Sequence, residues 1–258
     1  MKNYIKFLIV GIFIPTLFLL MFAMGCREED PVPSFSCNDI VDNSRFSSEE
    51  PFSSEIDVIE HSSLRLEANN GTIEIMEVSN SNSIKVTGKK RVESTSKEDA
   101  DAHLKELSVD IQDLTKEILI KTVQPKYSGG RNYIINYTIT IPKDLNITVS
   151  SVNGCVKLDE IIGNVAVDLI NGDIDSRVTL PLDGTIDLSV VNGNIYLNVP
   201  MNTSAIFTSK VANGNIRVSN LELRNRIETA NSLTGMVGDG RGTIRLNIGN
   251  GRIRATGF

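Results

Sequence analysis

The chain has 258 residues and a formal net charge of −6, and it contains no tryptophan and only 5% aromatic residues. An acidic chain repels phosphate backbones, and this one shows no basic stripe along its sequence, so nucleic acid is excluded as the expected partner. The scarcity of aromatic rings leaves few of the flat platforms that sugar-binding surfaces normally present.

Residues 1–25 predict a secretory signal peptide. Lys2 and Lys6 precede an apolar run from Phe7 to Met24, which ends at small residues and a cysteine. A transmembrane helix is the rival interpretation, but Pro15 interrupts the run, which is also slightly shorter than the roughly 20 apolar residues that a spanning helix needs.

The end of this segment, Ala23-Met24-Gly25-Cys26, resembles the lipobox of bacterial lipoproteins. The resemblance implies cleavage before Cys26 and acylation of Cys26, which makes the membrane a partner and predicts an outer-membrane lipoprotein of the bacterial cell envelope. Several acyl chains hold a protein to a bilayer where a single chain is marginal. We therefore expect a tethered protein.

Residues 26–55 predict the lipid anchor and a flexible linker, because they are rich in Pro, Ser and charge and show little apolar periodicity. The cluster Arg27-Glu28-Glu29-Asp30 resembles the signal by which some outer-membrane lipoproteins reach the cell surface. It is equally compatible with the start of a solvated linker, so a periplasmic and a surface-facing location both stay open.

Two further cysteines remain once Cys26 is acylated. In an exported protein Cys37 and Cys155 either form a disulfide or stay as two unpaired thiols. Cys155 occupies a repeat position that is mostly polar, which predicts that its sulfur points outward.

Residues 56–258 predict one β domain, with a repeat that is clearest over residues 145–258. Asn-Gly pairs, and one Asn-Ser pair, recur at intervals of 18 to 21 residues. A period of this length is typical of units that bury their apolar faces by stacking on their neighbours. The expected corner residues are Asn153, Gly154, Asn171, Gly172, Asn192, Gly193, Asn213, Gly214, Asn231, Asn250 and Gly251.

Apolar and polar residues alternate on both sides of these pairs, which is the pattern of a strand with one buried face. The column two residues before each Asn contains Ser151, Leu169, Val190, Val211, Thr229 and Ile248, and the column three residues after it contains Val156, Ile174, Ile195, Ile216, Thr234 and Ile253.

The segments between the pairs vary in sequence, which favours a parallel β-solenoid over a string of hairpins. Each coil would have roughly 20 residues and three short strands. Coils stacked in chain order would place Val190 beside Val211 and Ser189 beside Lys210. The asparagine amides would hydrogen-bond along a ladder, and each glycine would adopt a positive φ. An antiparallel sandwich or roll is the alternative.

The segments VNGNIYL, ANGNIRV and LINGDID, and the closing GDGRGTIRLNIGNGRIRATGF, resemble a bacterial family of β-strand-repeat proteins of unknown function that are labelled as adhesins. Upstream, LRLEANNGTIEIMEV resembles the first coil of that family, and YIINYTITIPKDLNITVSSVNG resembles the strands that lead into the repeats. The likeness covers about residues 55–258. It implies a stack of Asn-Gly coils, and the label by itself establishes no activity.

Residues 96–107 predict a short helix that caps an end or edge of the β domain. Ser96 is suited to the N-cap, and acidic residues fill the first turn. The residues that fall on one side are Ala100, His103, Leu104 and Leu107.

Catalytic and metal-binding motifs are sparse. His61 and His103 are the two histidines of the chain, and no HExxH or CxxC spacing accompanies them, so we expect no metal site, no cofactor and no catalytic triad. Five carboxylates, three near one corner and two one coil further on, could bind calcium or act as acid and base, or they form a solvated acidic face. They are Asp168, Asp173, Asp175, Asp183 and Asp187.

The loop around SGGRN contains the candidate contact residues Tyr127, Arg131 and Tyr133, with an ordinary hairpin turn as the alternative. Two functions therefore stay open. The first is a non-catalytic, lipid-anchored module that binds an extracellular glycan or protein, or serves as an envelope scaffold. The second is a glycan-active lyase or hydrolase that uses an acidic face.

Overall fold

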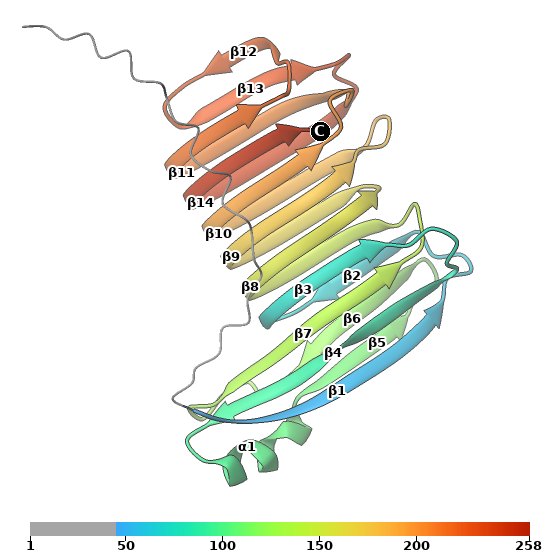
Figure 1. Ribbon diagram of the computed structural model, residues 1–258, viewed down its shortest axis with the longest axis vertical. Coiled ribbons are helices and arrows are strands. Elements are labelled where there is room, and N and C mark those ends of the chain that lie inside the picture. The colour runs from blue at the N-terminus through green and yellow to red at the C-terminus, as the bar shows by residue number, and fades with distance from the viewer. Residues whose placement is uncertain (1–44) are drawn as a thin grey trace, which may run out of the picture. The chain divides into compact units, whose positions relative to one another are not determined.

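The computed structural model describes residues 45–258, which form an all-β fold with one short α-helix (Figure 1). The strands belong to one 14-stranded sheet that mixes parallel and antiparallel pairs. The all-β class expected from the sequence is confirmed. No helix within residues 45–258 has both the length and the apolar character needed to cross a bilayer.

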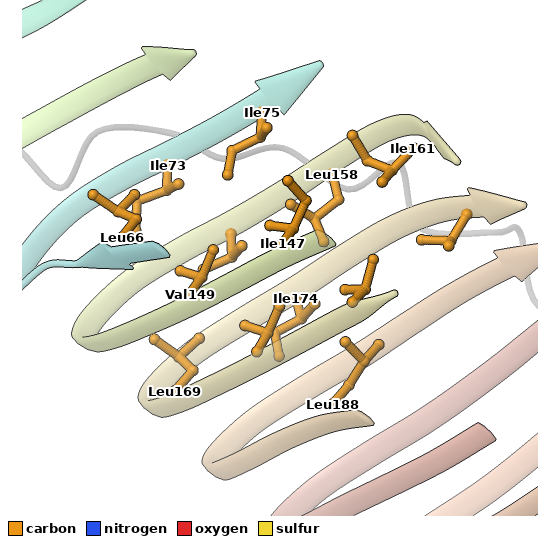
Figure 2. Close-up of a cluster of buried hydrophobic side chains, with 14 of the residues drawn as sticks. Leu66, Ile73, Ile75, Ile147, Val149, Leu158, Ile161, Leu169, Ile174 and Leu188 are labelled. Carbon is orange, nitrogen blue, oxygen red and sulfur yellow. The ribbon is translucent and has the colours of Figure 1, made fainter. Parts of the chain in front are cut away.

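Five long strands carry the repeat, and each folds back on itself at its Asn-Gly pair. Figure 2 shows this bend near Val149, Leu169 and Leu188, and the last two repeat strands follow the same course in register. We call the part before the pair the first arm and the part after it the second arm. In β10 the side chains that point between the arms are Ile186, Leu188 and Val190 on the first and Ile195, Leu197 and Val199 on the second, all buried. The five strands are β8 (Asn146–Ile162), β9 (Val165–Thr179), β10 (Thr185–Val199), β11 (Ala205–Ser219) and β14 (Gly242–Gly257).

These strands pair in parallel and in register, in the spatial order β8, β9, β10, β14, β11. Asn192 lies beside Asn171 on one side and beside Asn250 on the other. The expected stacking in chain order is therefore wrong at its end, because β14 lies between β10 and β11. Ser189 and Val190 neighbour β14, and not Lys210 and Val211.

The segment after β11 explains this order. The chain forms the antiparallel pair β12 (Arg224–Glu228) and β13 (Ser232–Val237), and β13 pairs with the first arm of β11. That edge of β11 is then occupied. Both arms of β14 carry inward apolar residues, and between β10 and β11 they are covered on both sides. This burial favours insertion over a position at the end of the stack.

The N-terminal half continues the same two layers with separate strands. β2 (Ser63–Glu67) pairs with the first arm of β8 and β3 (Asn70–Glu77) with its second arm, so Asn70-Gly71 forms one more corner. β6 (Glu117–Val123) then pairs with β2, and β7 (Asn132–Ile141) pairs with β3. Three further strands lie outermost. β5 (Ser108–Asp113) is antiparallel to β6, β4 (Ser83–Ser94) is antiparallel to β7, and β1 (Phe46–Asp57) is antiparallel to β4.

The domain is thus a two-layer arrangement that closes at the Asn-Gly corners. The first-arm layer contains β5, β6, β2, the first arms, β13 and β12, and the second-arm layer contains β1, β4, β7, β3 and the second arms. A uniformly parallel solenoid with three strands per coil is not what residues 45–258 form. The antiparallel strands lie at both ends, and each repeat is one bent strand.

The predicted linker, residues 26–55, extends too far. Strand β1 begins at Phe46 and pairs with β4 over its whole length. Its sequence, FSSEEPFSSEID, lacks clear alternation because β1 is an edge strand whose residues are mostly exposed, and Pro51 and the acidic residues are typical of such edges. The signal peptide, Cys26 and the rest of the linker lie outside the described residues.

The predicted helix is confirmed as α1 (Lys97–His103), followed by a single 3₁₀ turn (Leu104–Glu106). The Ser96 hydroxyl accepts a hydrogen bond from the backbone N–H of Asp99 and thereby caps the helix. Ala100 and Leu107 are fully buried. Helix α1 contacts β1 and β4 at the N-terminal end of the sheet (Figure 1).

The core lies between the two layers and runs through the whole stack. Figure 2 shows Leu66, Ile73, Val149, Leu158 and Ile174 pointing into this space from successive strands. Complete burial of each Leu or Ile contributes roughly 1.5–3 kcal/mol, so the apolar columns supply most of the driving force for stacking.

Candidate functional site

The corner ladder is the most regular polar feature of the domain. The Nδ2 of Asn153 donates to the Oδ1 of Asn70 at 2.7 Å, and the Nδ2 of Asn171 donates to the Oδ1 of Asn153 at 2.8 Å. The same bond joins Asn192 to Asn171, Asn250 to Asn192 and Asn213 to Asn250, at 2.8 to 2.9 Å. Every amide donates in the same direction along the stack.

Glycine is required at the corners for two reasons, as Gly193 illustrates. Its φ is +147°, a region that other residues rarely adopt. A Cβ at this position would also lie 1.7 Å from the carbonyl oxygen of Gly172 on the strand below. The corners are therefore structural, and they leave no room for a ligand on the inner side.

Asn231 does not belong to this ladder. It lies in the turn between β12 and β13, and its amide donates to the carbonyl oxygens of Val211 and Ala212. The Asn-Ser sequence lacks the glycine that the corner needs, so the segment forms an antiparallel hairpin instead. Thr229 is accordingly exposed. Asn70, which the sequence pattern of the later repeats did not single out, takes the vacant place in the ladder.

The three candidate contact residues in the β6–β7 loop and at the start of β7 have different surroundings. Tyr127 is 81% exposed. Tyr133 is buried, and its hydroxyl donates to Glu106 at 3.0 Å. Burial and this neighbouring carboxylate raise the pKa of Tyr133. Tyr133 therefore packs inside the fold, and only Tyr127 is accessible to a partner.

Arg131 connects this loop to helix α1. Its guanidinium donates two hydrogen bonds of 2.7 Å to the carboxylate of Asp99. These bonds, together with one from the Ser94 hydroxyl, hold the pKa of the Asp99 carboxyl well below its usual range. The bonds to Asp99 also raise the pKa of Arg131. Two nitrogens of this guanidinium are bonded to Asp99, so Arg131 holds the loop against the helix and is not available to bind a partner.

The five aspartates singled out from the sequence do not converge. Asp168 and Asp187 lie on first arms, and Asp173 and Asp175 lie on second arms, so the two pairs face outward from opposite layers. Asp183 lies in a loop, where it pairs with Arg241 at 2.7 Å.

Two of these aspartates have raised pKa values. Burial raises the pKa of Asp175, with Asp159 adding to the shift and Lys157 opposing it. Burial also raises the pKa of Asp187, with Arg245 opposing the shift and Asp168 adding to it. Each carboxyl thus has a cation near it, and no pair forms across a cleft. Within residues 45–258 no cluster of His, Cys, Asp and Glu is placed to hold a metal ion.

An open cavity of about 380 Å³ lies near β12 and β13. Its lining residues are Met201, Glu222, Arg224, Val237, Gly238 and Asp239. Arg224 donates to the carbonyl oxygen of Gly238 and lies 3.9 Å from Asp239. The positive charge of Arg224 is thus already paired with groups of the cavity wall.

Cys155 lies on the second arm of β8 and is disulfide-bonded. The other cysteines of the chain, Cys26 and Cys37, lie outside the described residues. Pairing of Cys155 with Cys37 therefore stays a prediction.

No protein-family model and no curated protein sequence matches this chain. Its fold is similar to that of a Clostridium sporogenes protein described as a "putative cell adhesion protein", with a TM-score of 0.52 and 12% identity. The alignment covers 82% of this chain and 100% of that one. At this identity the likeness concerns the fold alone.

A Bacteroides fragilis protein described as a "putative adhesin" aligns over 81% of this chain and 98% of its own, with 11% identity and a TM-score of 0.24. A Parabacteroides distasonis protein described as a "Putative lipid binding protein" aligns over 81% and 96%, with 13% identity and a TM-score of 0.26. Superposition at these scores is too poor to carry an argument.

Proposed function

We propose that this chain is a lipid-anchored, non-catalytic module of the bacterial cell envelope. Acylated Cys26 holds it to the outer membrane, and the rest of residues 26–44 separates the domain from the bilayer. The parallel strands from β8 to β11 act as a rigid, solenoid-like block that presents flat faces to an extracellular glycan or protein, or that serves as an envelope scaffold.

The outer surface of the second-arm layer supports this proposal. One in-register row of outward side chains crosses six strands and contains Glu74, Lys157, Asp175, Tyr196, Arg254 and Arg217. Polar rows of this kind are suited to contacts with an extended partner, because side chains one strand spacing apart repeat along the surface.

The positions of the carboxylates argue against the alternative, a glycan-active enzyme. Glycoside hydrolysis uses two carboxyl groups that flank one bond, at roughly 5 to 10 Å from each other. Here Asp168 and Asp187 share one outer face and Asp173 and Asp175 share the other, but none of the four lines the described cavity, so neither pair flanks a cleft that could hold the scissile bond. A binding function needs no such cleft.

The test uses the full chain, purified in a non-ionic detergent without a sugar headgroup. We expect it to bind immobilised glycans on an array, or proteins of the envelope or of a host surface, and to release no oligosaccharide from the same glycans during long incubation. Steady release of oligosaccharides, abolished by Asp175→Asn or Asp187→Asn, would establish the enzyme instead.

A further inference from the structure

Three arginines gather on the outer face of the second-arm layer. Arg252 and Arg254 lie on the second arm of β14, and Arg217 lies beside Arg254 on β11. Ile253 is buried between the two arginines of β14, so both of them point outward. Neighbouring strands are roughly 4.8 Å apart and alternate residues of one strand roughly 6.8 Å, so the three guanidinium groups share one small patch. We call these three residues the arginine triad.

The triad differs from the other arginines of residues 45–258 because no carboxylate or carbonyl oxygen pairs with its guanidinium groups, although Arg252 and Arg254 interact electrostatically with Tyr196. Arg45 donates to the carbonyl oxygens of Glu93 and Gly130. The remaining arginines outside the triad form ion pairs, which are Arg65–Glu117, Arg91–Glu93, Arg131–Asp99, Arg177–Glu160, Arg224–Asp239, Arg226–Glu228, Arg241–Asp183 and Arg245–Asp187. No described carboxylate lies within ion-pair distance of Arg217, Arg252 or Arg254.

The aspartates of the same face lie too far from the triad to pair with it. Asp173 and Asp175 lie on β9, which is separated from β14 by β10. The Asp173 carboxylate accepts hydrogen bonds from the backbone and the side chain of Asn194. Three like charges side by side repel one another, and in a chain of net charge −6 they form a local excess of positive charge.

We propose that the arginine triad is an anion-binding site for an acidic polysaccharide, whose carboxylate or sulfate groups the guanidinium groups bind. This rests on the binding function proposed above and names the class of ligand. Guanidinium forks match planar anionic groups with two parallel hydrogen bonds. The triad lies on an open sheet surface and lines no described cavity, which suits a polymer with repeated charges better than a small enclosed anion.

The experiment measures binding of the full chain, in the same detergent, to immobilised polygalacturonate, dextran sulfate and neutral dextran. We expect binding to one or both anionic polymers and none to neutral dextran. The variant R217Q/R252Q/R254Q weakens this binding by at least about tenfold, and Arg217→Gln alone weakens it by about threefold.

The control variant is R65Q/R226Q/R245Q, which removes the same charge from ion-paired arginines. We expect it to change binding by less than about twofold, because it lowers the bulk charge of the chain by the same amount but leaves the triad intact. Matching thermal unfolding of the two triple variants shows that both are folded. Equal losses of binding in both would mean a non-specific charge effect and would overturn the proposal.

Three other outcomes also overturn it. Triad-dependent binding to vesicles of phosphatidylglycerol and phosphatidylcholine, without polysaccharide binding, would assign the patch to a lipid surface. Binding that emerges only after Glu28, Glu29 and Asp30 are neutralised would assign it to the chain's own acidic segment. Binding to neutral glycans that is independent of the triad would disprove this inference but would still agree with the proposed function. The absence of any glycan or protein partner would disprove the proposed function itself.

Discussion

The insertion of β14 between β10 and β11 makes a specific prediction about crosslinking. Ser189 lies in register with Asn247, and Asn247 lies in register with Lys210. Cysteines at Ser189 and Asn247 would thus be one strand spacing apart, roughly 4.8 Å, within the range of about 4.4 to 6.8 Å between Cα atoms that a disulfide spans. Cysteines at Ser189 and Lys210 would be two spacings apart, roughly 9.6 Å, and could not be joined without moving the backbone.

The crosslink should also stabilise the domain. Joining residues 189 and 247 closes a loop of about 58 residues, and the chain-entropy estimate for such a loop is about 4 kcal/mol, an upper value because strain in the folded state reduces it. The assay compares the free energy of unfolding of the double variant with and without reductant. Peptide mapping under non-reducing conditions identifies the bond and separates it from the native disulfide of Cys155.

Stacking in chain order would give the opposite result. Rapid and complete formation of the 189–210 disulfide, with none between 189 and 247, would refute the strand order described above. Formation of both at similar rates would show that the last strand exchanges between two positions.

Three further predictions concern the corner, the core and the anchor. Gly193→Ala should destabilise the domain by several kcal/mol, because the added Cβ would clash with the Gly172 carbonyl. The Cβ added by Gly130→Ala meets no atom, so this variant should cost about 1 kcal/mol from its backbone conformation alone. Denaturant unfolding compares the two variants, and equal costs would contradict the close stacking at the corner. Burial raises the pKa of Tyr137 to about 12 from its ordinary value of 10.0, so its contribution to stability is complete below pH 10 and is lost between pH 10 and 12. The loss of stability should be about 2 to 3 kcal/mol. It should be absent in Tyr137→Phe and unchanged in Tyr127→Phe, a control at an exposed tyrosine. An identical alkaline stability profile for wild type and Tyr137→Phe would show that Tyr137 is not the group responsible. Cys26→Ser should abolish acylation, and a variant that still carries acyl mass would disprove the anchor.

The repeat itself could be predicted from the sequence because it is written in local chemistry. Alternation marks which face of each strand is buried, and the Asn-Gly pair marks where the strand must turn. Leu169, Val190 and Ile248, which the pattern placed in one inward column, are all buried. The same reasoning misplaced Asn231, which is followed by Ser in place of the corner glycine and lies in a hairpin turn.

Strand β1 and the binding candidates were harder to predict, because their roles depend on neighbours far away in the chain. The segment from Phe46 to Asp57 becomes a strand only through pairing with β4. Tyr133 and Arg131 are polar residues of a loop in the sequence, yet one is buried beside Glu106 and the other is paired with Asp99.

The sequence by itself determined the all-β class, the buried faces and the five Asn-Gly corners from Asn153 to Asn250, because each of these depends on residues within a few positions of one another. It did not determine the order of the strands. Every repeat offers the same two apolar arms and the same Asn-Gly corner, so many stacking orders satisfy the local pattern equally well. Only the tertiary structure decided that β14 lies beside β11, since β13 covers the other edge of that strand. The same choice brings Arg217 next to Arg254, 37 positions further along the chain, and creates a patch of positive charge that no stretch of the sequence contains.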